Sequence, residues 1–205
     1  MNNNLTEIIF IIDKSGSMWP LADDTVGGFN SFIEEQKKLE GEVKLTTVLF
    51  STSCDTLHDG INLKEVKPLT KEDYTPSGCT ALYDAIGCTI TKVGQRLAAT
   101  DEDKRPGKVI VCITTDGEEN ASLEYSQSKI KEMIEEQQSK YSWEFIFLGA
   151  NMDAVNEGSK VGISKAFNYS ATSKGTASLY ASVSKGVESY RSAGVLDSAC
   201  FDSLE

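Results

Sequence analysis

The sequence predicts an α/β fold: an open, mostly parallel β-sheet with one antiparallel edge strand and helices on both faces. Short apolar runs, which suit buried strands, alternate along the chain with longer segments whose apolar residues recur at helical spacing. The run 108–114 is almost entirely apolar, as a parallel strand covered on both faces should be. The segment 54–63 alternates only loosely and closely follows the expected strand 43–50, so we expect a hairpin partner at the sheet edge.

The first part of the chain is expected to form a strand over residues 7–12 and then an amphipathic helix from 21 to 39, which Gly41 ends. The apolar face of that helix consists of Val26, Phe29, Phe32 and Ile33. Beyond the two strands described above, a second helix begins at Thr80, because the apolar residues that follow recur at intervals of three and four. They are Leu82, Ile86, Ile90, Val93 and Leu97.

The second part of the chain continues the alternation after the apolar run. The expected elements are a helix over 122–138, a strand over 143–148, a short helix from about Asp153, a short strand over 166–169 and a last helix capped by Thr172 or Ser173. Alternating strands and helices of this kind indicate parallel neighbours joined by helical crossovers.

Length and composition indicate a single domain over residues 1–205, because no Pro-, Gly- or Ser-rich linker divides the chain. No apolar stretch approaches the ~18 residues of a membrane helix. The start of the chain also lacks the basic and apolar regions of a signal peptide, so we expect a cytoplasmic location. The net charge of −11 argues against binding to nucleic acid, whose phosphates require a basic surface.

The pentapeptide Asp-Lys-Ser-Gly-Ser at 13–17 directly follows the apolar run 8–12. Alternate residues of an extended chain project to one side, so Asp13, Ser15 and Ser17 can converge on one point. One carboxylate and two hydroxyls suit a hard divalent cation better than they suit catalysis. The carboxyl end of a strand is also where open α/β sheets carry their sites, so the pattern predicts a metal site here.

Two further oxygen-bearing side chains are expected near that site. Asp116 follows the strand 108–114 and is therefore placed at the carboxyl end of another strand. Thr80 lies in a loop ahead of the first turn of the second predicted helix. Because the carboxyl ends of parallel strands meet at one edge, Asp116 is a candidate for the same site, and Thr80 is a further oxygen-bearing residue at the start of a helix.

Taken together, three segments resemble the metal-ion-dependent adhesion site, or MIDAS, of the von Willebrand factor type A (VWA) family. They are the D-x-S-x-S motif at 13–17, Gly-Cys-Thr-Ala-Leu at 78–82 and Thr-Asp-Gly-Glu at 115–118. Their order and spacing match over about residues 5–150, and the resemblance implies a Rossmann-like fold. Residues 151–205 are then expected to complete the sheet and one of its faces.

The resemblance implies a role for each of five residues. Ser15, Ser17 and Thr80 would supply hydroxyl oxygens, while Asp13 and Asp116 would hold the ion directly or through water. The implied ion is Mg²⁺, with Mn²⁺ or Ca²⁺ as alternatives. Such an ion requires about six oxygen ligands, and the groups of this chain cannot fill every position. One position therefore stays open, and a carboxylate from another protein can fill it.

The implied function is a metal-dependent protein–protein interaction module and not an enzyme. Its partner is expected to present an Asp or Glu. The phrase Phe-Leu-Gly-Ala-Asn at 147–151 resembles stand-alone bacterial or phage members, whose partners include AAA+ ATPases and products of neighbouring genes. Neither nucleic acid nor a membrane is expected as a partner.

Other interpretations of the same residues stay open. Asp13 and Asp116 could simply cap helices, with the serines shaping a turn. A metal-dependent hydrolase of phosphoesters or peptides would need a general base, for which Glu118 and Glu119 are candidates. The only histidine, His58, falls in the expected edge hairpin and is expected to be a surface residue away from the site.

A third interpretation is a structural subunit whose interface does not depend on metal. Trp19, just past the second serine of the motif, fits either of two arrangements. It could form an apolar rim for a contact at the metal face, or it could pack onto the domain itself.

Overall fold

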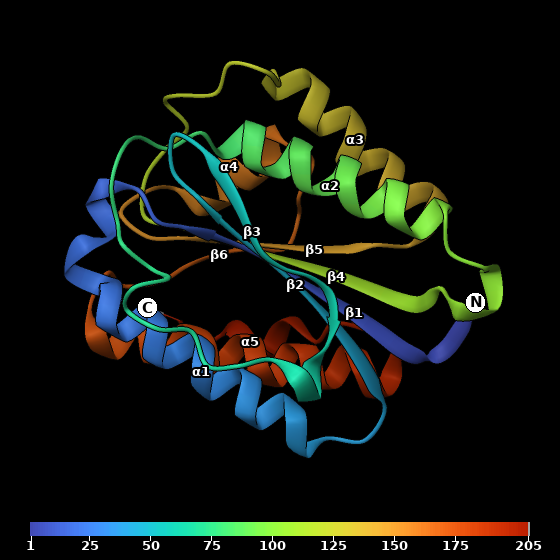
Figure 1. Ribbon diagram of the computed structural model, residues 1–205. Helices are drawn as coiled ribbons and strands as arrows, with labels where there is room; N and C mark the ends of the chain where they lie inside the picture. The colour runs from blue at the N-terminus through green and yellow to red at the C-terminus, as the bar shows by residue number, and fades with distance from the viewer. Residues whose placement is uncertain (205) are drawn as a thin grey trace.

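The computed structural model describes residues 1–204 and contains one six-stranded sheet. The strands are β1 (Asn2–Asp13), β2 (Glu42–Phe50), β3 (Cys54–Asn62), β4 (Pro106–Thr115), β5 (Glu144–Gly149) and β6 (Ala166–Asn168). Their order across the sheet is β3-β2-β1-β4-β5-β6 (Figure 1). Every neighbouring pair is parallel except β2 and β3, which are antiparallel. The predicted fold class and its antiparallel edge strand are therefore confirmed.

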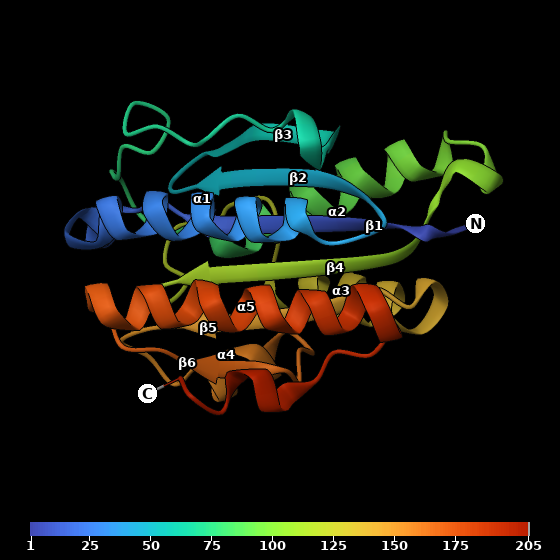
Figure 2. The same ribbon diagram turned by 90° about the horizontal axis from the view of Figure 1, so that it is seen from below.

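Helices cover both faces of this sheet. The α-helices are α1 (Ala22–Lys38), α2 (Leu82–Ala98), α3 (Gln127–Tyr141), α4 (Ala154–Lys160) and α5 (Ser173–Ala193). Within residues 1–204, four short 3₁₀ helices accompany them: η1 (Gly16–Leu21), η2 (Leu63–Glu65), η3 (Glu102–Lys104) and η4 (Ser198–Phe201). Helices α1 and α5 lie on one face, and α2, α3 and α4 lie on the other (Figures 1 and 2).

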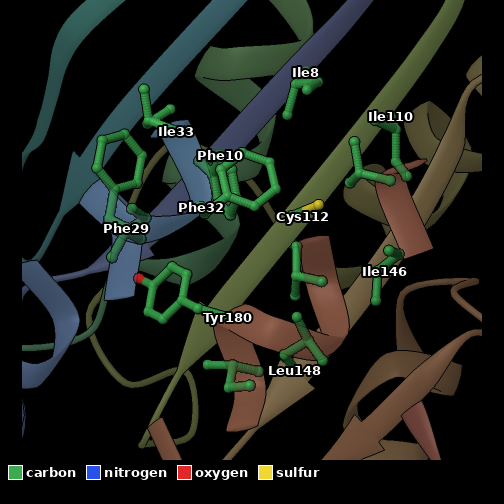
Figure 3. Packing of buried hydrophobic residues seen from close by; sticks show 14 of the residues in the cluster. Ile8, Phe10, Phe29, Phe32, Ile33, Ile110, Cys112, Ile146, Leu148 and Tyr180 are labelled. Atoms are coloured by element: carbon green, nitrogen blue, oxygen red, sulfur yellow. The ribbon is translucent and has the colours of Figure 1, made fainter. Parts of the chain in front are cut away.

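Two apolar cores result, one on each face of the sheet. Successive side chains of a strand point to opposite faces, so Phe10 of β1 faces α1 and α5 while Ile9 and Ile11 face α2. Phe10 makes edge-on contacts with Phe29 at 5.6 Å and with Phe32 at 4.9 Å between ring centroids (Figure 3). This packing fixes the position of β1, the strand that ends in the predicted metal motif.

Two predicted helix starts are confirmed by their capping bonds. The Asp153 side chain accepts a hydrogen bond from the amide of Asn156 at 3.0 Å, and α4 begins at the next residue. The Thr172 hydroxyl accepts from the amide of Gly175 at 3.1 Å at the start of α5. Both bonds satisfy amides that the first helical turn leaves without a partner.

The predicted start of the third long helix is wrong. We expected it at residue 122, but α3 begins at Gln127, after its cap Ser126. The amides of residues 121–125 bond instead to the side chains of Asp84 and Glu119. These side-chain acceptors, the local Glu119 and the distant Asp84, compete with helical hydrogen bonding and hold the segment as a loop.

The remainder of the chain after β5 adds β6 to the sheet edge and α5 to one face. Tyr169, Leu196 and Phe201 belong to the apolar core beneath α1 and α5. Within residues 1–204, no helix combines the length and the apolar character needed to cross a membrane.

Candidate metal centre

Three loops meet at the carboxyl edge of the sheet, and backbone hydrogen bonds join them. The loop after β1 is tied to the loop before α2 by the bond from the Gly16 amide to the Gly78 carbonyl at 3.0 Å and by that from Ser77 to Lys14 at 2.8 Å. The loop before α2 is tied to the loop after β4 through the amide of Asn120, which donates to the Thr80 carbonyl at 3.0 Å. The three predicted motif segments are therefore neighbours.

Asp13 ends β1 and is fully buried. Its Oδ1 accepts from the Ser15 amide at 2.6 Å, and its Oδ2 accepts from the Thr115 hydroxyl at 2.7 Å. Burial raises the pKa of Asp13, the hydrogen bonds from Thr115 and Ser15 oppose this, and the nearby Asp116 charge adds to the rise. The carboxylate is thus held in one orientation while each oxygen keeps a free lone pair.

Ser15, Ser17 and Asp116 form a connected set beside it. The Ser17 hydroxyl donates to Asp116 Oδ1 at 2.5 Å, and the Ser15 and Ser17 hydroxyl oxygens lie 3.1 Å apart. Ser15 and Asp116 are buried, whereas Ser17 is exposed. The set therefore opens to solvent on the side of Ser17.

Thr80 reaches the same place from the loop before α2. A Cβ atom built on Gly117 would lie 3.7 Å from the Thr80 hydroxyl oxygen and 3.9 Å from that of Ser17. Both hydroxyls therefore lie over the same glycine, next to Asp116. The structure brings together all five residues that the sequence predicts: Asp13, Ser15, Ser17, Thr80 and Asp116. Their role as ligands stays a prediction.

The donor set fits a hard divalent cation. It offers two carboxylates and three hydroxyls, which are oxygen ligands of the kind that Mg²⁺, Mn²⁺ and Ca²⁺ prefer. None of the ion pairs formed within residues 1–204 involves Asp13 or Asp116. Two neighbouring buried carboxylates without a cationic partner are costly, and a bound cation would offset that cost.

A site built from nitrogen and sulfur ligands is not present in the described chain. Residues 1–204 contain no group of three or more His, Cys, Asp or Glu side chains that could hold a metal. A cation between the two carboxylates would therefore take its remaining ligands from neutral oxygens, and the nearby hydroxyls are candidates.

Two residues that support Asp13 were missed at the level of sequence. Thr115 bonds to its carboxylate, and the hydroxyl of the buried Tyr74 donates to its main-chain carbonyl. Thr115 directly precedes Asp116, so its position in the motif was a usable signal. Tyr74 is 61 residues away in the sequence, and no local pattern marks it.

Two further acidic residues, Glu119 and Asp84, hold the loops in place by hydrogen bonds, and the carboxylates of the centre itself are those of Asp13 and Asp116. Glu119 accepts from the amides of Tyr83, Ala121 and Ser122 and from the Ser122 hydroxyl, at 2.7 to 3.0 Å. Asp84 accepts from the amides of residues 123–125 at 2.8 to 2.9 Å. Glu119, a candidate general base from the sequence, is therefore part of the hydrogen-bonded scaffold of these loops.

The other candidate bases lie outside this set. Glu118 is exposed to solvent. His58 lies on β3 as expected, but it is half-buried, with its Nδ1 3.1 Å from the Thr47 hydroxyl. His58 is therefore less exposed than expected, because the β2–β3 pairing places its ring against Thr47 of the neighbouring strand.

The fold and the site together define a class of protein: an open α/β sheet with an all-oxygen, two-carboxylate centre at its carboxyl edge. Comparison with solved structures identifies the fold as that of VWA domains. Proximal thread matrix protein 1 from the mussel byssus, solved with a zinc-occupied MIDAS motif, superposes with a TM-score of 0.61 at 13% identity. The match covers 89% of this chain and 46% of that one.

Two other solved structures support the same assignment. The von Willebrand factor type A protein from Catenulispora acidiphila has a TM-score of 0.58 at 12% identity, over 89% of this chain and 42% of that one. The manganese-loaded TRAP protein of Plasmodium vivax has a TM-score of 0.50 at 19% identity, over 73% of this chain and 59% of that one.

These similarities concern the fold and not the sequence. A comparison with protein-family models found no match, and neither did a comparison with curated protein sequences. The chain spans less than half of the length of the byssus protein and of the Catenulispora protein.

Proposed function

We propose that this chain is a protein-binding module that holds a divalent cation and, through it, a carboxylate of its partner. Asp13 and Asp116 would provide the negative charge, and Ser15, Ser17 and Thr80 would provide neutral oxygens. The observation that carries the proposal is the convergence of these five side chains at the carboxyl edge of a VWA fold, with both carboxylates buried and free of ion pairs.

The chain's own residues would prepare the site in defined ways. Thr115 and the Ser15 amide orient the Asp13 carboxylate, and Ser17 orients that of Asp116. When bound, the cation supplies an electrophilic position that a carboxylate oxygen can occupy. The exposed side of Ser17 leaves room for that approach.

Mg²⁺ is the proposed ion, with Mn²⁺ or Ca²⁺ as alternatives, because it prefers oxygen ligands and keeps open positions for water. Two structures of the same fold carry zinc at a MIDAS motif and manganese, respectively, which supports a divalent cation in general. The choice among these ions is part of the proposal.

The proposed partner is a protein that presents an Asp or Glu, such as an AAA+ ATPase or the product of a neighbouring gene. With a net charge of −11, the chain would repel nucleic acid and acidic proteins, so the partner's acid should lie within a neutral or basic surface. The cytoplasmic location and the bacterial or phage origin stay predictions.

A binding role is favoured over hydrolysis because Glu119, an acidic residue near the centre, is occupied by structural hydrogen bonds. Glu119 bonds to four donors, so its lone pairs are committed to the scaffold. Metal-assisted hydrolysis usually needs a general base within reach of the attacking water, or a second metal. Glu118 is the remaining acid close to Asp116, and its substitution therefore separates the two interpretations.

The first experiment is calorimetric titration with Mg²⁺ and Mn²⁺ of the wild type, Asp13→Ala and Glu118→Ala. We expect binding at one site in the wild type and in Glu118→Ala, and none in Asp13→Ala. Asp13→Ala removes a carboxylate without enlarging an apolar core, so its far-UV spectrum should stay native.

Each alternative gives a different result. Absence of binding to the wild type at millimolar metal would contradict the proposed site, and a metal-independent interface would then be the better interpretation. Metal-dependent turnover of a phosphoester or peptide that Glu118→Ala abolishes would instead establish a hydrolase.

A further inference from the structure

A groove of about 430 Å³ opens beside the candidate metal centre. One wall is formed by η1 and the first turns of α1, and the other by the segment 71–76, which belongs to a stretch that runs alongside α1 (Figure 1). Its apolar lining consists of Trp19, Pro20, Ala22, Val26, Tyr74 and Pro76. The volume lies within the ~300–1,000 Å³ range of small-molecule pockets, so it can hold a side chain.

The groove is physically joined to the metal centre. Tyr74 lines the groove and donates its hydroxyl to the main-chain carbonyl of Asp13. Trp19 lies two residues past Ser17, and 63% of its surface is exposed. A peptide segment that places a carboxylate near Ser17 therefore has the groove within reach of its neighbouring residues.

The charge of the groove indicates what it can accept. Among the described residues that line it, only Asp23 and Lys71 are charged, and they pair with each other at 2.7 Å. Both side chains are exposed, and their opposite charges cancel, so the lining residues give the groove no net charge. An uncharged, apolar group is the complementary occupant.

We infer that this groove holds an aromatic or branched aliphatic side chain of the same partner segment that offers its Asp or Glu to the metal. The partner's recognition element is then a pair, an acid and a nearby apolar residue. This assignment rests on the proposed function, because the acid fixes where the segment lies. Trp19 would be the main contact, since exposed aromatic residues that become buried dominate the affinity of interfaces.

The test uses random peptides displayed on phage, selected on the immobilised full chain in Mg²⁺ and eluted with EDTA. We expect the eluted peptides to be enriched in Asp or Glu with Trp, Phe, Leu or Ile a few positions away. A synthetic peptide of the consensus sequence should bind Trp19→Ala at least ~10-fold more weakly than the wild type.

Val195→Ala is the matched control. Val195 has the same exposed fraction as Trp19, 63%, but it follows α5, whose last turn contacts Lys108 near the amino end of β4, away from the carboxyl ends of the strands. The affinity of the Val195→Ala variant for the peptide should equal that of the wild type. The chain has only two tryptophans, so the emission of the wild type minus that of Trp19→Phe reports on Trp19, and it should shift to shorter wavelength when the peptide binds.

The possible outcomes distinguish a failure of the groove inference from a failure of the proposed metal-dependent function. Peptides that carry an acid without apolar enrichment, or a consensus peptide that binds Trp19→Ala as tightly as the wild type, would overturn the groove and leave the metal function standing. A failure to recover EDTA-eluted peptides, or recovery of the same peptides on Asp13→Ala, would overturn the proposed function and the groove with it.

Discussion

At the scale of single residues, Asp13 is the side chain on which the candidate centre depends most. It is fully buried, yet it accepts hydrogen bonds from both sides and neighbours a second carboxylate. A residue selected only for stability at this position would be apolar, because burying a carboxylate is expensive. The proposed cation would account for a charged residue at this position.

His58 gives a prediction at the same scale. Burial lowers its pKa from the ordinary 6.5, while the charge of Asp73 partly opposes this. A lowered pKa means that the unfolded chain binds the proton more readily. The contribution of His58 to the free energy of unfolding is therefore present above pH 6.5 and is lost as the pH falls through the folded-state pKa.

As the chain has a single histidine, NMR titration of its imidazole signal measures this pKa directly. We expect a value below 6.5, and a smaller loss of stability in acid for His58→Gln than for the wild type. A titration midpoint at or above the ordinary value would show that the ring is solvated.

At the scale of elements, an ion-pair network fixes α2 on the sheet. Arg96 of α2 contacts both carboxylate oxygens of the fully buried Glu7 on β1, and its Nε donates to Asp59 of β3 at 2.9 Å. The Thr46 hydroxyl of β2 donates to Glu7 at 2.8 Å. Burial alone would lower the pKa of Arg96, but the hydrogen bonds and charges of Glu7 and Asp59 raise it.

This network predicts a large effect of breaking one partner. Arg96→Met should lower the free energy of unfolding by about 3–5 kcal/mol, because Glu7 would stay buried without a counter-charge. Chemical denaturation measures this. Lys104→Met is the control: its ion pair with Asp101 is exposed, so a change below about 1 kcal/mol is expected.

The double variant Glu7→Met and Arg96→Met isolates the cause. It removes both charges and should be more stable than Arg96→Met alone, since no unpaired charge is then buried. If the double variant is as unstable as the single one, packing and not charge accounts for the loss.

At the scale of the whole molecule, the parallel sheet gathers loops that are far apart in the sequence at one edge. The candidate centre joins the loops after β1 and β4 to the loop before α2. A ligand that binds these loops only in the folded chain stabilises the whole fold by mass action. The metal effect should therefore appear in global unfolding.

We expect the melting temperature to rise with Mg²⁺ and to fall again with EDTA. The stabilisation should approach about 2.7 kcal/mol at a Mg²⁺ concentration 100 times the dissociation constant. Salt also screens the net charge of −11, so the control is NaCl of equal ionic strength. An equal rise in NaCl, or in Asp116→Ala, would contradict a specific site.

The sequence by itself determined the order of the elements, the antiparallel edge strand and the residues of the candidate centre. These features are local: apolar periodicity marks strands and helices, and Asp13, Ser15 and Ser17 stand at alternate positions after a strand. Thr80 and Asp116 could also be predicted from the sequence, because each lies in a segment that resembles the MIDAS motif and adjoins a predicted helix or strand.

Only the tertiary structure decided where α3 begins, what supports Asp13 and what lies beside the metal centre. Asp84 turns residues 123–125 into a loop from about 40 positions away, and Tyr74 reaches Asp13 from 61 positions away. The tertiary structure also shows that Trp19 is exposed at the groove, whereas the sequence had left open whether its side chain packs onto the domain. Hydrogen bonds and packing between distant segments leave no periodic signal in the chain, so they become visible only once the sheet has brought its loops together.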